Sequence, residues 1–91
     1  MVAKGTGSSL GYSVFTPGTV LDSVCHETEE VAYVVSGSGE LHLDDGVVPF
    51  REGDALHIPA GLWHAVANTG AEDVIMVFGF PHPDYPPTER R

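Results

Sequence analysis

The chain has 91 residues and a formal net charge of −9, with four lysines and arginines against 13 aspartates and glutamates. Proteins that bind nucleic acid need clustered cations. The chain has no such cluster, which excludes nucleic-acid binding and disfavours contact with an anionic membrane. The apolar runs are too short to span a bilayer. A single cysteine and the absence of a visible signal peptide predict one cytoplasmic domain.

The first half of the chain has the composition of short strands separated by turns. Residues 1–11 are rich in glycine and serine, which predicts a flexible arm or one that orders on a partner subunit. β-Branched and aromatic residues predict strands at 12–16, 19–26 and 30–35. The glycines and serines of residues 36–39 predict a hairpin turn.

The second half continues this pattern and ends in a proline-rich segment. Asp44-Asp45-Gly46 is a strong hairpin signal, and residues 81–91 hold four of the seven prolines, which predicts a tail rather than a helix. No segment shows helical periodicity, and about eight short strands predict an antiparallel sandwich or barrel. The later strands are expected at 40–43, 47–50, 55–58, 63–68 and 73–80.

The stretch 53–68 organises the chain. Pro59-Ala60-Gly61 forces a turn, because proline fixes φ and removes a donor while glycine accepts a positive φ. His64 follows where the chain becomes extended again, and a rigid turn beside it can aim a ring nitrogen at one point. Alternation along a strand places His64, Val66 and Asn68 on one face.

Two groups of residues in the chain resemble the sequence motifs of the cupin superfamily. In the first motif one histidine is replaced by Val24, and the match runs over residues 18–68. The resemblance implies an all-β, single-domain protein of the small monocupin (cupin type-2 like) kind, with a double-stranded β-helix or jelly-roll barrel at 12–80. The matching positions are Gly18, His26, Glu30 and Gly37 in the first motif and Gly53, Pro59, Gly61, His64 and Asn68 in the second.

The resemblance also assigns metal binding to His26, Glu30 and His64. Two imidazoles and one carboxylate are the ligands of many non-haem iron(II) sites with open positions, and the same set suits zinc and would take manganese, nickel or copper. Val24 occupies the place of the usual fourth ligand and has no donor atom. We therefore expect one divalent transition metal per chain, with Glu30 or a bound water as the catalytic base.

The cavity around these ligands is expected to be apolar. No lysine or arginine falls on a predicted inward position, which argues against substrates that carry a carboxylate or phosphate. Alternation places His57 and His42 outside the cavity, and His82 lies among the prolines of the tail. The predicted lining consists of Val24, Ala32, Val34, Leu56, Ile58, Val66 and Asn68.

Two functions of different classes are compatible with these residues. The first is a small metal-dependent enzyme that acts on a neutral, apolar or aromatic small molecule, by dioxygenation or by a redox-neutral isomerase, cyclase or lyase reaction. The alternative is a non-catalytic cupin that binds a small ligand as a sensor or accessory protein. We favour the enzyme. A small core with an open edge strand also predicts a homodimer.

Overall fold

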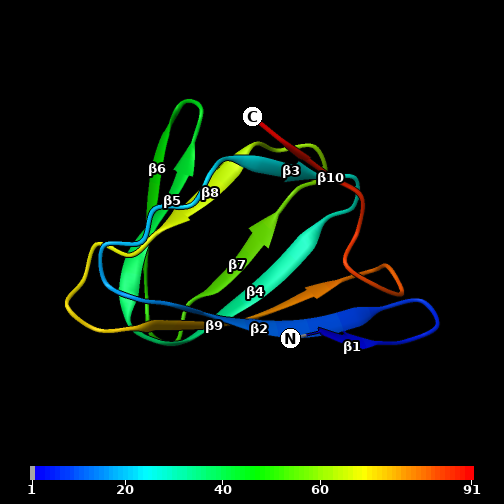
Figure 1. Cartoon of the computed structure of the whole chain (residues 1–91), viewed down its shortest axis with the longest axis horizontal. Helices are drawn as coiled ribbons and strands as arrows, with labels where there is room; N and C mark the ends of the chain where they lie inside the picture. Colours follow the sequence, from blue (N-terminus) through cyan, green and yellow to red (C-terminus); the bar gives the residue numbers. More distant parts are fainter. Residues whose placement is uncertain (1) are drawn as a thin grey trace.

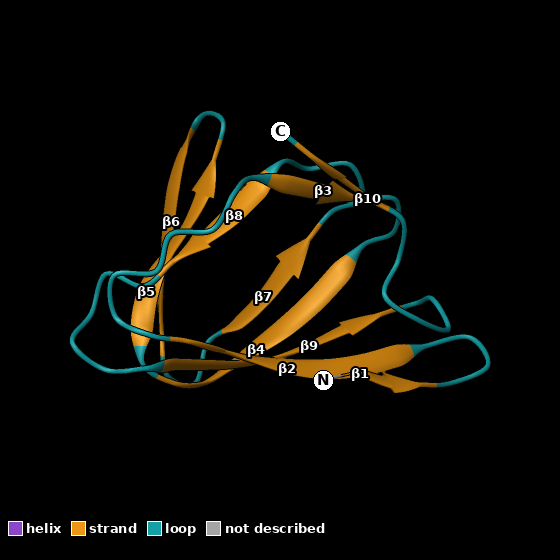
Figure 2. Ribbon diagram, in the orientation of Figure 1, coloured by secondary structure: helices purple, strands orange, loops and turns teal. Residues whose placement is uncertain are grey.

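The computed structural model describes residues 2–91 and consists of two five-stranded antiparallel sheets that face each other (Figure 1). Strands and loops account for all of these residues, and none of them forms a helix that could cross a membrane (Figure 2). The predicted all-β double-sheet barrel is confirmed. The first sheet has the order β1 (Val2–Lys4), β2 (Ser9–Phe15), β9 (Val74–Phe80), β4 (Glu30–Ser36) and β7 (Ala55–Ile58). The second has the order β10 (Thr88–Arg90), β3 (Val24–His26), β8 (His64–Ala67), β5 (Ser38–Leu43) and β6 (Gly46–Arg51).

Strand β4 illustrates how alternation builds the interior. Glu30, Ala32 and Val34 are buried, whereas the residues between them are exposed, because successive side chains of a strand point to opposite faces. The later part of β4 packs into the hydrophobic core, and its first residue, Glu30, lies at the open part of the barrel. The core cluster contains Ala32, Val34, Phe50, Val74 and Met76.

Two internal elements predicted from the sequence are not formed as expected. The strand expected at 19–26 is reduced to Val24–His26 and one isolated bridge between Val20 and Ala67, because a turn hydrogen bond from Thr19 N to Thr16 O bends the chain there. The turn expected at 36–39 does not form a hairpin, since β4 and β5 lie in different sheets. Gly37 makes this crossing with a φ of 87°, and an added Cβ there would lie 2.5 Å from the carbonyl oxygen of Asp73.

The two terminal segments form strands where the sequence predicts an arm and a tail. Within the expected arm, β1 pairs with β2, and Met1 lies outside the described residues. Within the expected tail, β10 pairs with β3 (Figure 1). Each terminal strand completes the edge of one sheet, so its backbone groups bond to a neighbouring strand. Amino-acid composition alone does not predict such pairing between strands that are far apart in the sequence.

Candidate metal centre

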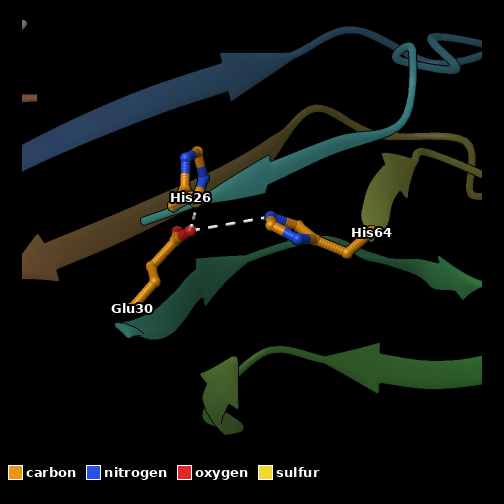
Figure 3. A group of neighbouring side chains, drawn as sticks. All are labelled: His26, Glu30 and His64. Atoms are coloured by element: carbon orange, nitrogen blue, oxygen red, sulfur yellow. Dashed lines mark ion pairs between the residues drawn. The ribbon is translucent and has the colours of Figure 1, made fainter. Parts of the chain in front are cut away.

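The side chains of His26, Glu30 and His64 converge between the two sheets (Figure 3). Their ligand atoms all lie within 4.8 Å of one another. Oε1 of Glu30 lies 3.2 Å from Nε2 of His26 and 3.7 Å from Nε2 of His64. The three residues are buried, with exposed fractions of 5%, 9% and 5% in chain order. The structure therefore brings together the three residues that the sequence singles out.

The chain bends between His26 and Glu30 and does not remain extended. His26 ends β3 in the second sheet and Glu30 begins β4 in the first, so the two side chains meet across the interior and not along one strand. The Pro59–Gly61 turn is tied to the same region, because the backbone N–H of Gly61 donates to the carbonyl of His26 over 2.9 Å. This bond couples the positions of His26 and His64.

The ring of His64 is held in one orientation by a hydrogen bond to a nearby backbone carbonyl. Its Nδ1 lies 2.9 Å from the carbonyl oxygen of Leu62. A carbonyl can only accept a hydrogen bond, so Nδ1 carries a proton and Nε2 is the nitrogen available to Glu30 or to a metal. Metal-binding histidines commonly have this arrangement, in which the second ring nitrogen donates to a backbone oxygen.

Glu30 and His64 shift each other's titration. Burial raises the pKa of Glu30, but the hydrogen bonds and charge of the two histidines outweigh it and leave that pKa below its ordinary value. Burial lowers the pKa of His64, but the hydrogen bonds to Glu30 and Leu62 and the carboxylate charge outweigh it and leave that pKa above its ordinary value. The site therefore favours an anionic Glu30 beside a cation.

The stability of the metal-free protein is expected to be highest in mildly acidic solution. Glu30 contributes stability above its ordinary pKa of about 4.5, and this contribution is lost as the pH falls through the lowered folded value. His64 contributes below its ordinary pKa of about 6.5, and this contribution is lost as the pH rises through the raised folded value. Urea unfolding in EDTA across this range measures the effect. A Glu30→Gln variant that keeps the full pH dependence would contradict the assignment.

A pocket of about 400 Å³ opens beside the cluster. Its walls are mainly apolar and aromatic and come from both sheets and the C-terminal segment. Four aromatic residues contribute, and the rings of Phe80 and Tyr85 lie 5.1 and 5.4 Å from the ring of His26. The lining residues are Ser13, Phe15, Val20, Leu21, Asp22, Val24, His26, Glu30, His64, Ala65, Val66, Met76, Phe78, Phe80, Tyr85 and Arg90.

Most of the predicted lining lies elsewhere in the barrel. Val24 and Val66 line the pocket, but Ala32 and Val34 belong to the core and Leu56 packs against it. The other two are also absent from the pocket wall: Ile58 is buried, and Asn68 donates to the carbonyls of Phe15 and Glu72. Alternation predicts which side chains of a strand face the barrel interior. It does not predict whether that part of the interior is packed core or open pocket.

The C-terminal segment supplies residues that the sequence pattern does not reveal. Tyr85 and Arg90 both line the pocket, so a cation reaches the cavity from the predicted tail, outside the positions predicted to face inward. Arg90 is opposite Val24 in the ladder between β10 and β3. Phe78 and Phe80 could have been found, since they share one face of the last apolar strand. Tyr85 and Arg90 could not, because their positions depend on the pairing of a distant segment.

The remaining histidines lie apart from the cluster, as the sequence predicts. The imidazole of His57 is 57% exposed and lies 2.9 Å from the carboxylate of Glu29. His42 lies 3.2 Å from Glu40. His82 hydrogen-bonds through Nδ1 to the carbonyl of Asp84. Each of these three rings therefore has a polar partner outside the cluster.

Several curated proteins are similar in sequence to most of this chain. The chain is 36% identical over 87 residues to protein SchB of Streptomyces halstedii, and 35% identical over 74 residues to the polyketide synthase CurC of Streptomyces cyaneus. These matches take in 90% and 80% of this chain but only 63% and 48% of the two relatives. A 5-nitrosalicylic acid 1,2-dioxygenase of a Bradyrhizobium species is 30% identical, over 77% of this chain and 34% of the dioxygenase.

Solved structures have the same fold at lower sequence identity. A double-stranded β-helix protein from Klebsiella pneumoniae superposes with a TM-score of 0.87 at 24% identity, over 98% of this chain and 79% of that one. The polyketide cyclase RemF from Streptomyces resistomycificus superposes with a TM-score of 0.83 at 24% identity, over 94% and 61% of the two chains. The sequence model of the cupin domain matches residues 11–80. The chain therefore belongs to the cupin domain family.

Proposed function

We propose that this cupin is a metal-dependent enzyme that acts on an apolar or aromatic small molecule held beside His26, Glu30 and His64. The observation that carries this proposal is the apolar, aromatic-walled pocket of about 400 Å³ that opens on the buried cluster. Its volume is within the range of small-molecule sites. The names of the relatives, a polyketide synthase and a dioxygenase of a nitrosalicylic acid, support a substrate with carbonyl or phenol groups.

The three buried residues fit a divalent transition metal. Two imidazole nitrogens and a carboxylate oxygen within 4.8 Å of one another match a two-histidine, one-carboxylate ligand set that leaves coordination positions open. In the metal-free protein a proton on Nε2 of His64 would balance the negative charge of Glu30, and a bound metal would take the place of that proton. A bound metal would polarise a substrate carbonyl as a Lewis acid or, if it were iron, support chemistry with oxygen.

A redox-neutral cyclisation uses the residues of this pocket directly. Glu30 remains ionised at neutral pH because the two histidines outweigh the burial that would raise its pKa, so its carboxylate can accept a proton from a carbon between two carbonyls. That carbon then forms a bond to the carbon of a third carbonyl, whose oxygen takes up the proton that Glu30 accepted. Burial raises the pKa of Tyr85, so its neutral hydroxyl can donate a hydrogen bond. Phe15, Phe78 and Phe80 exclude water from the folded substrate.

Ring-opening dioxygenation is a second candidate function. The observation that favours it is the ligand set itself, since two histidines and one carboxylate with open positions are typical of non-haem iron(II) oxygenases. The dioxygenase relative is consistent with this reaction. The two candidates differ in their need for oxygen, which makes them separable by experiment.

Anaerobic reconstitution followed by assays with and without oxygen tests the enzyme. Metal-free protein is loaded with iron(II), zinc or manganese and incubated with phenols and with poly-β-carbonyl compounds. New product without oxygen supports the cyclisation, and steady oxygen uptake supports the dioxygenase. Glu30→Gln, which keeps the size of the side chain but removes the charge, should lose turnover, and its metal content is measured in parallel to separate loss of the base from loss of the metal. Ligand binding without turnover for every metal and substrate would overturn the enzyme in favour of a binding protein.

We also propose that two copies associate through the outer face of the first sheet. Tyr12, Val77 and Tyr33 form one row across β2, β9 and β4, and no member of this row is charged. The pair of His57 and Glu29 lies at one end of the same face, beside Val31. In a protein of net charge −9, pairing through this row keeps most of the acidic surface of the two copies apart. The exposed apolar residues of β2 and β4 on this face are Leu10, Tyr12, Val14, Val31, Tyr33 and Val35, each at least 43% exposed.

The expected result is a dimeric mass by light scattering at micromolar concentration. Tyr33→Glu should give a monomer, because a buried unpaired carboxylate is unfavourable at an interface. Val47→Glu is the matched control, since Val47 is 53% exposed on β6 of the other sheet, and it should remain dimeric. A monomeric wild-type protein, or a dimeric Tyr33→Glu variant, would count against this interface.

A further inference from the structure

Thr88 lies directly behind His26, on the side away from Glu30. The two residues are opposite each other in the antiparallel ladder between β10 and β3, so their side chains project from the same face. Oγ1 of Thr88 lies 2.7 Å from Nδ1 of His26. The other ring nitrogen, Nε2, lies 3.2 Å from Oε1 of Glu30. The imidazole is therefore held between the C-terminal strand and the cluster.

The direction of the hydrogen bonds can be deduced from the next contact. The hydroxyl of Thr88 donates to the carbonyl oxygen of Pro86 over 2.9 Å. A threonine hydroxyl has a single proton. With that proton on the bond to Pro86, Oγ1 accepts from Nδ1 of His26. Nε2, which faces Glu30, is then the nitrogen that would coordinate a metal. The carbonyl of Leu62 has the same effect on His64, so both rings present Nε2 to the cluster.

We propose that Thr88 is a positioning residue that keeps the Nδ1 nitrogen of His26 protonated and thereby directs Nε2 toward the metal. The inference rests on the metal site of the proposed function. Outer hydrogen-bond partners of metal-binding histidines fix the tautomer and orientation of the ring, and their loss typically weakens metal binding. Because His26 is only 5% exposed, a solvent molecule does not readily replace the hydroxyl of Thr88.

The hydrogen bond that orients His26 comes from the C-terminal segment. The cupin-domain match ends at residue 80, and Thr88 lies beyond it on β10. Two backbone bonds flank the β10–β3 ladder, from Glu27 N to Pro87 O over 3.0 Å and from Arg91 N to Ser23 O over 3.3 Å. Tyr85 of the same segment packs the edge of its ring against His26 at a centroid distance of 5.4 Å. The segment thus completes the site that the barrel begins.

Nuclear magnetic resonance of protein labelled with ¹⁵N-histidine tests the proton, without any need for a metal. Long-range ¹H–¹⁵N correlations distinguish a protonated ring nitrogen from a bare one. In the metal-free wild-type protein, Nδ1 of His26 should be protonated. In Thr88→Val, which keeps the β-branched shape but removes the acceptor, Nδ1 should lose its proton. Thr88→Ser should restore the wild-type signal, and His64 should be unchanged in every variant.

Zinc titration of the same variants tests the consequence for the site. Thr88→Val should bind zinc about tenfold more weakly than the wild type, with Thr88→Ser within about twofold of it. Thr69→Val, the same change at an exposed turn, should bind as the wild type does. A bare Nδ1 in the wild type, or an unchanged zinc affinity in Thr88→Val, would overturn the role of Thr88. A wild type with the protonated Nδ1 that binds no metal would instead overturn the proposed function and leave the placement of Thr88 supported.

Discussion

Replacing His64 with alanine is expected to abolish metal binding. The Pro59–Gly61 turn and the bond from Nδ1 to the Leu62 carbonyl fix the aim of this ring, and among residues 2–91 the metal-binding group contains His26 and Glu30 besides it. Loss of an outer-shell partner already costs about 10–100-fold in affinity, so loss of a ligand should cost more than about 100-fold. Elemental analysis of purified protein should show about one metal per wild-type chain, removable by EDTA, and none in the variant.

The histidine that pairs with Glu29 provides a matched control. His57 is exposed, and its Nε2 lies 2.9 Å from a carboxylate oxygen, so His57→Ala removes an imidazole–carboxylate pair outside the cluster. It should keep full metal content. His26→Ala should lose metal as His64→Ala does. If both cluster variants retained full metal, the assignment of the site to His26, Glu30 and His64 would be wrong.

Replacing Val24 with histidine is expected to tighten metal binding by about tenfold, or about 1.4 kcal/mol. Val24 lines the pocket and is directly opposite His64 in the ladder between β3 and β8, and side chains at opposite positions lie on the same face. An imidazole at this position can therefore approach the cluster as a fourth ligand. Overpacking commonly costs about 1–3 kcal/mol, which limits the gain.

The same substitution should lower turnover while it raises affinity. An additional ligand fills a position that the three-residue set leaves open for substrate or oxygen. Metal titration calorimetry and the assays described above measure the two effects separately. Val47→His, which places an imidazole at an exposed position of β6, is the control and should change neither. An unchanged affinity in a folded Val24→His protein would show that residue 24 does not face the metal.

The placement of His64 could be predicted from the sequence because a short-range feature sets it. Pro59 and Gly61 form the turn that precedes His64, and Gly61 has the positive φ of 77° that such a turn requires. The resemblance to the cupin motifs identifies His26 and Glu30 as well, and these two residues lie in different sheets. Alternation also predicts correctly that His57 faces solvent.

The depth of the pocket and its polar residues were decided by the tertiary structure. Ala32 and Val34 face inward as predicted, but they pack in the core cluster with Val74 and do not line the pocket. Inward parity is a property of one strand, whereas the boundary between core and cavity depends on how side chains of both sheets pack together.

The sequence alone determined the all-β class, through its strand and turn pattern, and its resemblance to the cupin motifs implied the barrel and the three cluster residues. The environment of those residues was decided only in three dimensions. Thr88 reaches His26 across 62 positions of the chain, and Tyr85 and Arg90 reach the pocket in the same way. Their proline-rich segment carries no strand signal of its own, because proline lacks a backbone donor. Its structure comes from the unpaired edge of β3, whose backbone hydrogen bonds β10 satisfies.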